Sequence, residues 1–197
     1  MSFKDGKLYK VEKLNKSHPY WYDIVNIINN KTNINISYYI EELYSISWKH
    51  KPFKWSWAQE FKPNRRFFFC GISKSNIENI LDYGFQSNID IFRDGIYLTY
   101  HSNKAIDDSP EGYILSNMVY VPKSYVVNPY EEFNENEIDF IKNNFHSIEF
   151  RTNSIIQNLE VKNHTICIFN SNRVIPRFII KVKKDNNLSD LKLLDNN

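Results

Sequence analysis

The sequence predicts an α+β fold, with helices near its start and a series of short strands after them. In the first quarter of the chain, apolar side chains recur at the three- and four-residue spacing that is typical of helices. From residue 66 onward, short runs of apolar and aromatic residues alternate with turns, which favours strands. Because the pattern contains no repeated βαβ units, we expect mostly antiparallel or mixed pairing.

The first third of the chain contains one weak strand pattern and one interrupted helix pattern. Residues 7–11 fit an edge strand. Across 20–46, helical spacing continues on both sides of an Asn-rich break at 29–35, which predicts two helices. Residues 47–66, which combine tryptophans, prolines and basic side chains, predict an irregular connector.

Residues 66–85 predict a strand, a tight turn and a helix. The aromatic run 66–70 is typical of a buried strand, which we expect to stop at Gly71. Candidate N-caps of the helix are Ser73 and Ser75, the latter in a capping box with the glutamate three residues on. Gly84 stands where a left-handed C-terminal cap is favoured.

The remaining chain predicts five strands and two short helices. Pro176, within the last of these strands, indicates either an edge position or a bulge. Polar, Asn-rich stretches elsewhere, including most of 128–163, predict loops. The strands are expected at 95–99, 112–121, 124–127, 165–169 and 174–182, and the helices at 102–108 and 135–144.

Length and composition exclude several classes of protein. A chain of 197 residues suits one domain, and its 14 Phe, 13 Tyr and 4 Trp exclude an intrinsically disordered chain. No apolar run approaches the roughly 18 residues of a membrane helix. The net charge of +2 excludes a strongly basic nucleic-acid arm. With no secretion signal at the start, we expect an intracellular location and free thiols at Cys70 and Cys167.

Four segments occur in an order that matches one known family. Residues 68–85 follow the pattern apolar-His-Gly-Thr/Ser-x-x-x-Asn-x-x-x-Ile-Leu-x-x-Gly-Phe, except that Cys70 and Ile72 stand at the His and Thr/Ser positions. Residues 95–98 follow the pattern Gly-x-Tyr-Phe, except that Leu98 stands at the Phe position. The strands at 113–127 and 167–180 have the order and spacing of the family's later strand pairs. Together these segments resemble the ADP-ribosyltransferases of the poly(ADP-ribose) polymerase (PARP) type, over about residues 20–182.

The resemblance implies a fold and a co-substrate. The fold would be α+β and ADP-ribosyltransferase-like, with two small, mostly antiparallel sheets that form a cleft and with helices that flank them. It would form a single domain over 1–197, with a polar tail at 183–197. The co-substrate would be NAD, and the acceptor of ADP-ribose would be a protein or a nucleic acid.

Two of the family's three central positions are altered in this chain. The family uses His, Tyr and Glu, and the matching residues here are Cys70, Tyr97 and Thr165. Cysteine is a weak hydrogen-bonding group, and threonine has no charge with which to stabilise a cationic ribose. The resemblance therefore implies either transfer of one ADP-ribose per site or an inactive binding module. A nearby carboxylate, Glu149 or Glu160, is a candidate substitute for the missing Glu.

The resemblance also assigns contacts to the nicotinamide half of NAD. Tyr97 would stack on the nicotinamide ring, and the backbone of Gly71 would hold its amide, with Ser73 close by. Ala105 matches the position of a small hydroxyl residue that helps to hold this amide. His101, four residues after Tyr97, is a candidate replacement for the missing histidine.

Other interpretations of these residues remain open. Cys70 follows three phenylalanines, so a buried structural thiol is a strong alternative to a site residue. The cations and aromatics of 48–66 fit either a solvated connector or a binding segment for single-stranded nucleic acid. The five histidines and two cysteines lack the spacing of a zinc site.

Overall fold

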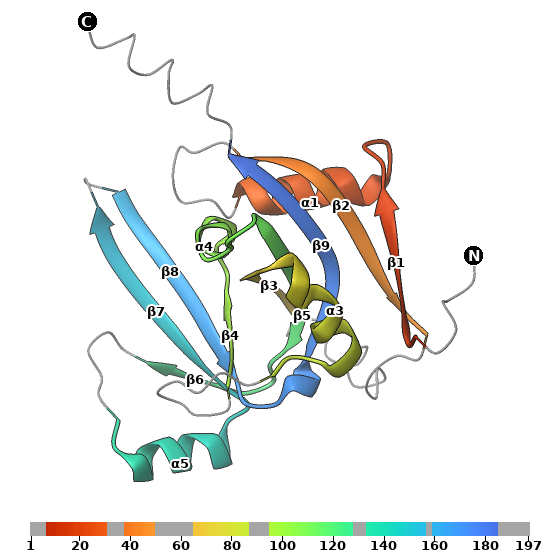
Figure 1. Ribbon diagram of the computed structural model, residues 1–197. Helices are drawn as coiled ribbons and strands as arrows, with labels where there is room; N and C mark the ends of the chain where they lie inside the picture. Colours follow the sequence, from red (N-terminus) through yellow and green to blue (C-terminus); the bar gives the residue numbers. More distant parts are fainter. Residues whose placement is uncertain are drawn as a thin grey trace, which may run out of the picture.

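The computed structural model describes residues 7–30, 38–49, 65–86, 95–127, 133–156 and 159–184, and these form an α+β fold (Figure 1). The elements are β1 (Tyr9–Leu14), α1 (Pro19–Asn30), β2 (Tyr38–Trp48), β3 (Arg65–Ile72), α3 (Lys74–Tyr83), β4 (Ile96–Thr99), α4 (Ser102–Asp107), β5 (Tyr113–Tyr120), β6 (Ser124–Val127), α5 (Glu135–Asn144), β7 (Ser147–Ile156), β8 (Leu159–Ile168), the 3₁₀ turn η2 (Ser171–Arg173) and β9 (Val174–Lys184).

The strands form one hydrogen-bonded sheet and not the two separate sheets that the resemblance implied. Its order is β1-β2-β9-β5-β3-β4-β8-β7-β6, and all described pairs are antiparallel except β6 with β7. The central strands β3 and β4 are in register only at Phe69 and Thr99, whereas every other neighbouring pair is in register over at least four residues. We call this narrow junction the waist. It joins a five-stranded half to a four-stranded half, which lie on either side of it in Figure 1.

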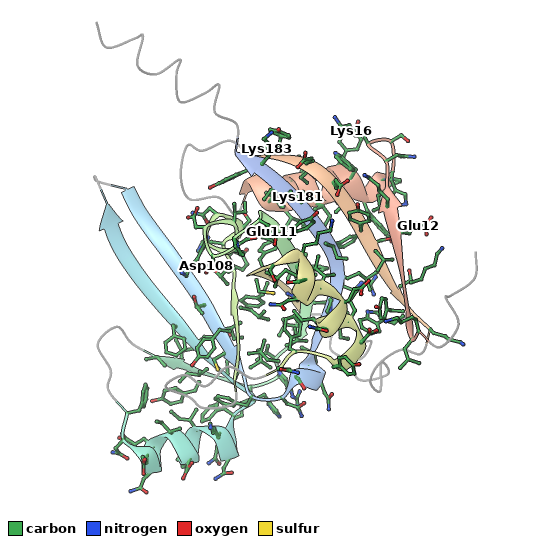
Figure 2. The ribbon with its side chains drawn as sticks, in the orientation of Figure 1. Glu12, Lys16, Asp108, Glu111, Lys181 and Lys183 are labelled. Carbon is green, nitrogen blue, oxygen red and sulfur yellow. The ribbon has the colours of Figure 1, made fainter. Side chains whose placement is uncertain are left out.

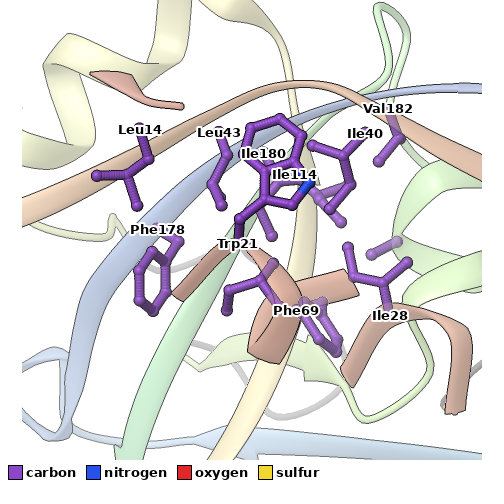
Figure 3. Packing of buried hydrophobic residues seen from close by; sticks show 12 residues of the cluster. Leu14, Trp21, Ile28, Ile40, Leu43, Phe69, Ile114, Phe178, Ile180 and Val182 are labelled. Atoms are coloured by element: carbon purple, nitrogen blue, oxygen red, sulfur yellow. The ribbon is translucent and has the colours of Figure 1, made fainter. Parts of the chain in front are cut away.

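Helices cover both faces of the five-stranded half. On one face, α1 and α4 enclose a cluster that includes Trp21, Ala105 and Ile180, part of which is shown in Figure 3. On the other face, α3 packs Leu81 onto a cluster that includes Ile179. Because Ile179 and Ile180 are adjacent in β9 and belong to different clusters, the strand is buried on both faces.

The four-stranded half has its own core. Val127, Ile148 and Cys167 come from β6, β7 and β8, and Ile141 of α5 packs against them. The start of α5 carries a capping box, in which the Asn134 side chain accepts a hydrogen bond from the backbone N–H of Glu137 and the Glu137 carboxylate accepts one from the backbone N–H of Asn134. This helix was predicted at 135–144, and its bounds are confirmed.

The second predicted helix of the first third is wrong, because this segment forms β2. Its apolar residues follow helical spacing, but a bulge between Ile40 and Glu42 places Ile40 and Leu43 in the same cluster. Ile46, three residues further, belongs to the cluster on the opposite face. A bulged strand that is buried on both faces therefore produces the spacing of an amphipathic helix.

Pro176 marks a bulge and not an edge. β9 lies between β2 and β5, and its register with β5 shifts where Asn117 is opposite Pro176. The register with β2 covers residues from Phe178 onward, so the missing N–H of the proline lies outside that ladder. The prediction of a bulge is confirmed, and the prediction of an edge strand is wrong.

Two further strands differ from the sequence-based expectation. β7 and the first part of β8 occupy 147–163, which was predicted to be loop. The predicted loop was wrong: residues 147–151 and 159–162 alternate polar and apolar side chains as strands do, but the segment as a whole is polar and Asn-rich, and that composition outweighed the short alternation. The predicted connector at 47–66 lies mostly outside the described residues, and its ends belong to β2 and β3. In the described part of the chain, no helix is long and apolar enough to cross a membrane.

Candidate functional site

A cleft of about 650 Å³ opens beside the waist. Cys70 and Gly71 line it from the end of β3, and Ile96 and Tyr97 line it from the start of β4. The strands that carry the first two motifs are neighbours in the sheet but pair only at Phe69 and Thr99, and the cleft lies where this pairing has ended. The structure therefore brings residues of both motifs into one cavity.

Gly71 occupies a position where the backbone of β3 approaches α4 very closely. A Cβ added to Gly71 would lie 2.2 Å from the carbonyl oxygen of Ala105 and 2.8 Å from the backbone nitrogen of Ser109. The hydroxyl of Ser109 donates a hydrogen bond of 3.1 Å to the carbonyl of Ile72, which fixes this contact. The absence of a side chain at Gly71 is thus required by the packing of β3 against α4.

Cys70 is a neutral thiol in the wall of the cleft. Its Sγ lies 3.5 Å from Nδ2 of Asn117, which donates a weak hydrogen bond to it. Burial raises the pKa of the Cys70 thiol to about 12, against the opposing effect of Asn117 and of the Leu115 backbone. The thiol is therefore protonated at neutral pH, and the side chain fits a structural role better than a nucleophilic one.

This pKa predicts that Cys70 reacts slowly with iodoacetamide in the folded protein. A free cysteine, with a pKa near 8.5, is about half thiolate at pH 8.5, so we expect alkylation of Cys70 to be roughly a thousandfold slower. Mass spectrometry of the alkylated protein over time measures this rate, and the same reaction in urea is the control. Labelling of folded Cys70 at the rate of the unfolded chain would contradict the assignment.

Tyr97 joins the cleft to the core of the four-stranded half. It lines the cleft, and it also packs against the cluster that contains Val127, Ile148 and Cys167. In the register of β4 with β8, Tyr97 lies directly opposite Cys167. These contacts restrict the motion of the Tyr97 ring. A ligand that stacks on it would therefore not lose free energy in ordering that side chain.

Thr165 lies near Tyr97 but is not among the residues that line the cleft. It is half-buried on β8 and opposite Thr99 of β4, so Thr165 and Tyr97 are on the same face of the sheet. Glu149 of β7 is opposite Ile166, which places it on the other face, where it is 2% exposed. Glu149 therefore does not supply a carboxylate beside Thr165. The side chain of Glu160 lies outside those described.

Ala105 and His101 are buried away from the cleft. Ala105 belongs to the core cluster under Phe69, and only its backbone carbonyl approaches Gly71. His101 is the N-cap residue of α4 and is 6% exposed, with its backbone N–H 3.2 Å from Oγ1 of Thr99. Neither residue is among those that line the cleft, so the structure does not place them with Cys70 and Tyr97.

Ser73 does line the cleft, at the start of α3. It is the N-cap residue, but its side chain makes no capping hydrogen bond, and its hydroxyl lies 3.0 Å from that of Ser75. The capping box predicted after Ser75 is therefore wrong. At the other end of the helix, Gly84 has φ +82° and ψ 179°, a conformation almost restricted to glycine, although not the left-handed helical one that was expected.

Three amide side chains of the cleft were missed as site residues. They are Asn76 and Asn79 of α3 and Gln86 beyond it. The spacing of Asn76 and Asn79, three residues apart in a predicted helix, was the available signal that they share a face.

Among the described residues that line the cleft, none is charged at neutral pH, so the cavity offers amides, hydroxyls, backbone groups and aromatic surface. In the same part of the chain, no group of His, Cys, Asp and Glu is arranged to hold a metal ion.

The sequence was also compared with known proteins, and neither the models of protein families nor the curated proteins give a match.

Proposed function

We propose that this protein binds NAD in the cleft and transfers one ADP-ribose from it to a protein or nucleic-acid acceptor. The observation that supports the proposal is the meeting of Gly71 and Tyr97 in one cavity beside the waist. These residues match the family's amide-binding glycine and nicotinamide-stacking tyrosine. On this proposal the fold is ADP-ribosyltransferase-like, and the two halves of the sheet correspond to the family's two sheets.

In the proposed reaction, nicotinamide leaves C1′ of the ribose with the electron pair of the C–N bond. The acceptor's oxygen or nitrogen forms the new bond to C1′ and releases its proton to solvent. Tyr97 would stack on the nicotinamide, the backbone of Gly71 would bind its amide, and the amides of Asn76 and Asn79 would bind ribose hydroxyls. These contacts would hold the nicotinamide and the ribose of NAD in one orientation, and such positioning is a large source of rate enhancement.

A second candidate is an NAD-binding module that does not turn over its ligand. The observation in its favour is the absence of charge from the described lining of the cleft, together with the neutral thiol of Cys70. Without an anion near C1′, developing positive charge on the ribose is poorly stabilised. Both candidates require NAD to bind, and they differ in whether nicotinamide is released.

Paired variants of Tyr97 test the proposal. Tyr97→Phe keeps the stacking surface, whereas Tyr97→Leu removes it and keeps a bulky apolar side chain. Because base–aromatic stacking contributes about 1–3 kcal/mol, we expect Tyr97→Leu to bind NAD at least about fivefold more weakly than Tyr97→Phe. Titration calorimetry with NAD gives the affinities, and thermal unfolding without ligand shows whether both variants are folded.

Incubation with labelled NAD and acceptor-containing lysate separates the two candidates. Label that becomes covalently attached and is lost in Tyr97→Leu supports the transferase. Stabilisation by NAD without attached label supports the binding module. If NAD neither stabilises the folded protein nor labels an acceptor, the proposal is wrong.

A further inference from the structure

Three basic residues lie in loops that backbone hydrogen bonds join to one another. Lys123 lies between β5 and β6, His146 between α5 and β7, and Arg173 at the end of η2. The backbone N–H of His146 donates to the carbonyl of Lys123 at 2.9 Å. The carbonyl of His146 accepts from the N–H of Phe169 at 3.3 Å, in the loop that leads to Arg173. The three loops are therefore tied together by their backbones.

Neighbouring groups hold these cations in place. Nζ of Lys123 lies 4.5 Å from the centre of the Phe145 ring, and Cζ of Arg173 lies 5.8 Å from the centre of the Tyr120 ring. The backbone N–H of Arg173 also donates to the carbonyl of Asn170 at 2.9 Å. Cation–π contacts of this kind order a long side chain without neutralising its charge.

None of these three side chains forms an ion pair with a carboxylate of the described residues. Elsewhere in the described chain, lysines do form such pairs, as Lys13 does with Glu42 and Lys104 with Asp108. The pKa of His146 is lowered, and two of these cations contribute to that shift after burial. Burial lowers the pKa of His146, and the charges of Arg173 and Lys123 lower it further, against the opposing effect of the Lys123 carbonyl.

We propose that Lys123, His146 and Arg173 form a binding site for a phosphate group. A guanidinium and an ammonium group supply the charge-assisted hydrogen bonds that phosphate oxygens accept most strongly. The imidazole of His146 adds a hydrogen-bond donor that can take up a proton when the anion binds. None of the three residues lines the cleft beside the waist, so the proposed phosphate site does not depend on the ligand of that cleft.

The resonance of His146 provides the test. In a low-salt, phosphate-free buffer, carbon–proton NMR spectra of the five histidines are recorded during addition of inorganic phosphate. We expect a saturable shift of the His146 signal, with little change for the buried His101. A bound phosphate favours the imidazolium form, so the pKa of His146 rises when phosphate is present. A His146 signal that does not respond to phosphate would overturn the proposal.

Charge-matched variants make the test specific to this site. Arg173→Gln is expected to weaken phosphate binding by about tenfold or more, because a hydrogen bond to a charged group is lost. Arg173→Lys keeps the charge but not the planar guanidinium, so its affinity for phosphate is expected to lie between those of the unmodified protein and Arg173→Gln. Lys16→Gln removes the same charge from the turn between β1 and α1, far from these loops (Figure 2), and is expected to leave binding almost unchanged. Equal weakening by Arg173→Gln and Lys16→Gln would overturn the proposal.

A second titration identifies the source of the phosphate. A short oligodeoxythymidylate with a 5′-hydroxyl carries only backbone phosphates. If it shifts the His146 signal at lower concentration than inorganic phosphate, and if salt weakens this effect steeply, the ligand is a nucleic acid. If inorganic phosphate alone shifts the signal, the ligand is a free phosphate or a phosphate monoester. Each of these results supports the site, provided that Arg173→Gln weakens the response by about tenfold or more.

Discussion

Replacement of Thr165 by glutamate is expected, on the proposed function, to raise the rate of NAD cleavage by about 10²–10³-fold. Thr165 matches the family's glutamate, and the register of β4 with β8 places it on the same face of the sheet as Tyr97. A carboxylate there would stabilise the positive charge that develops on the ribose as nicotinamide leaves. Because Thr165 is only half-buried, the longer side chain does not have to enter a closed core.

Release of nicotinamide, followed by chromatography, measures this gain. Thr165→Gln is the matched control, because it has nearly the same size and shape but no charge, and we expect it to leave the rate close to that of the unmodified protein. A Thr165→Glu protein that binds NAD but cleaves it no faster than Thr165→Gln would contradict the assignment of this position. That result would favour the second candidate function, in which the cleft binds NAD but does not cleave it.

Gly71→Ala is expected to destabilise the protein by at least about 1–3 kcal/mol and to abolish the proposed binding of NAD. The added methyl would overlap the backbone of α4, which lies 2.2 Å away at Ala105 and cannot rotate aside as a flexible side chain does. At this chain length, each kcal/mol lowers the unfolding temperature by about 2–4 °C.

Thermal and urea unfolding measure the loss of stability, and Asn79→Ala is the control. Asn79 lines the same cleft but is exposed, so its truncation is expected to change stability by less than about 0.5 kcal/mol. If Gly71→Ala is as stable as Asn79→Ala, the close approach of β3 to α4 is not tight enough to require glycine.

Local signals in the sequence predicted the elements that carry the cleft. The run before Gly71 and the helix that stops at Gly84 are marked by composition and spacing within about twenty consecutive residues, and both elements were predicted, although β3 continues through Gly71 to Ile72. β2 was not, because its spacing reflects a bulge and burial on two faces, which depend on strands distant in the sequence. Propensity and periodicity cannot report such long-range pairing.

The candidate site was predicted only in part for the same reason. Cys70, Gly71, Ser73 and Tyr97 lie on β3, β4 and the start of α3, whose positions follow from the strand order, and they meet in the cleft. Ala105 and His101 were expected beside them, but both are buried and neither lines the cleft. The cluster of basic side chains was not predictable, because three loops far apart in the sequence contribute one residue each.

The waist of the sheet has a mechanical consequence. A continuous ladder of backbone hydrogen bonds resists rotation of one strand against the next, whereas β3 and β4 share a single registered pair. The angle between the two halves of the sheet is therefore set mainly by the packing of α4 and of the core side chains. The width of the cleft depends on that packing and not on hydrogen bonds between β3 and β4.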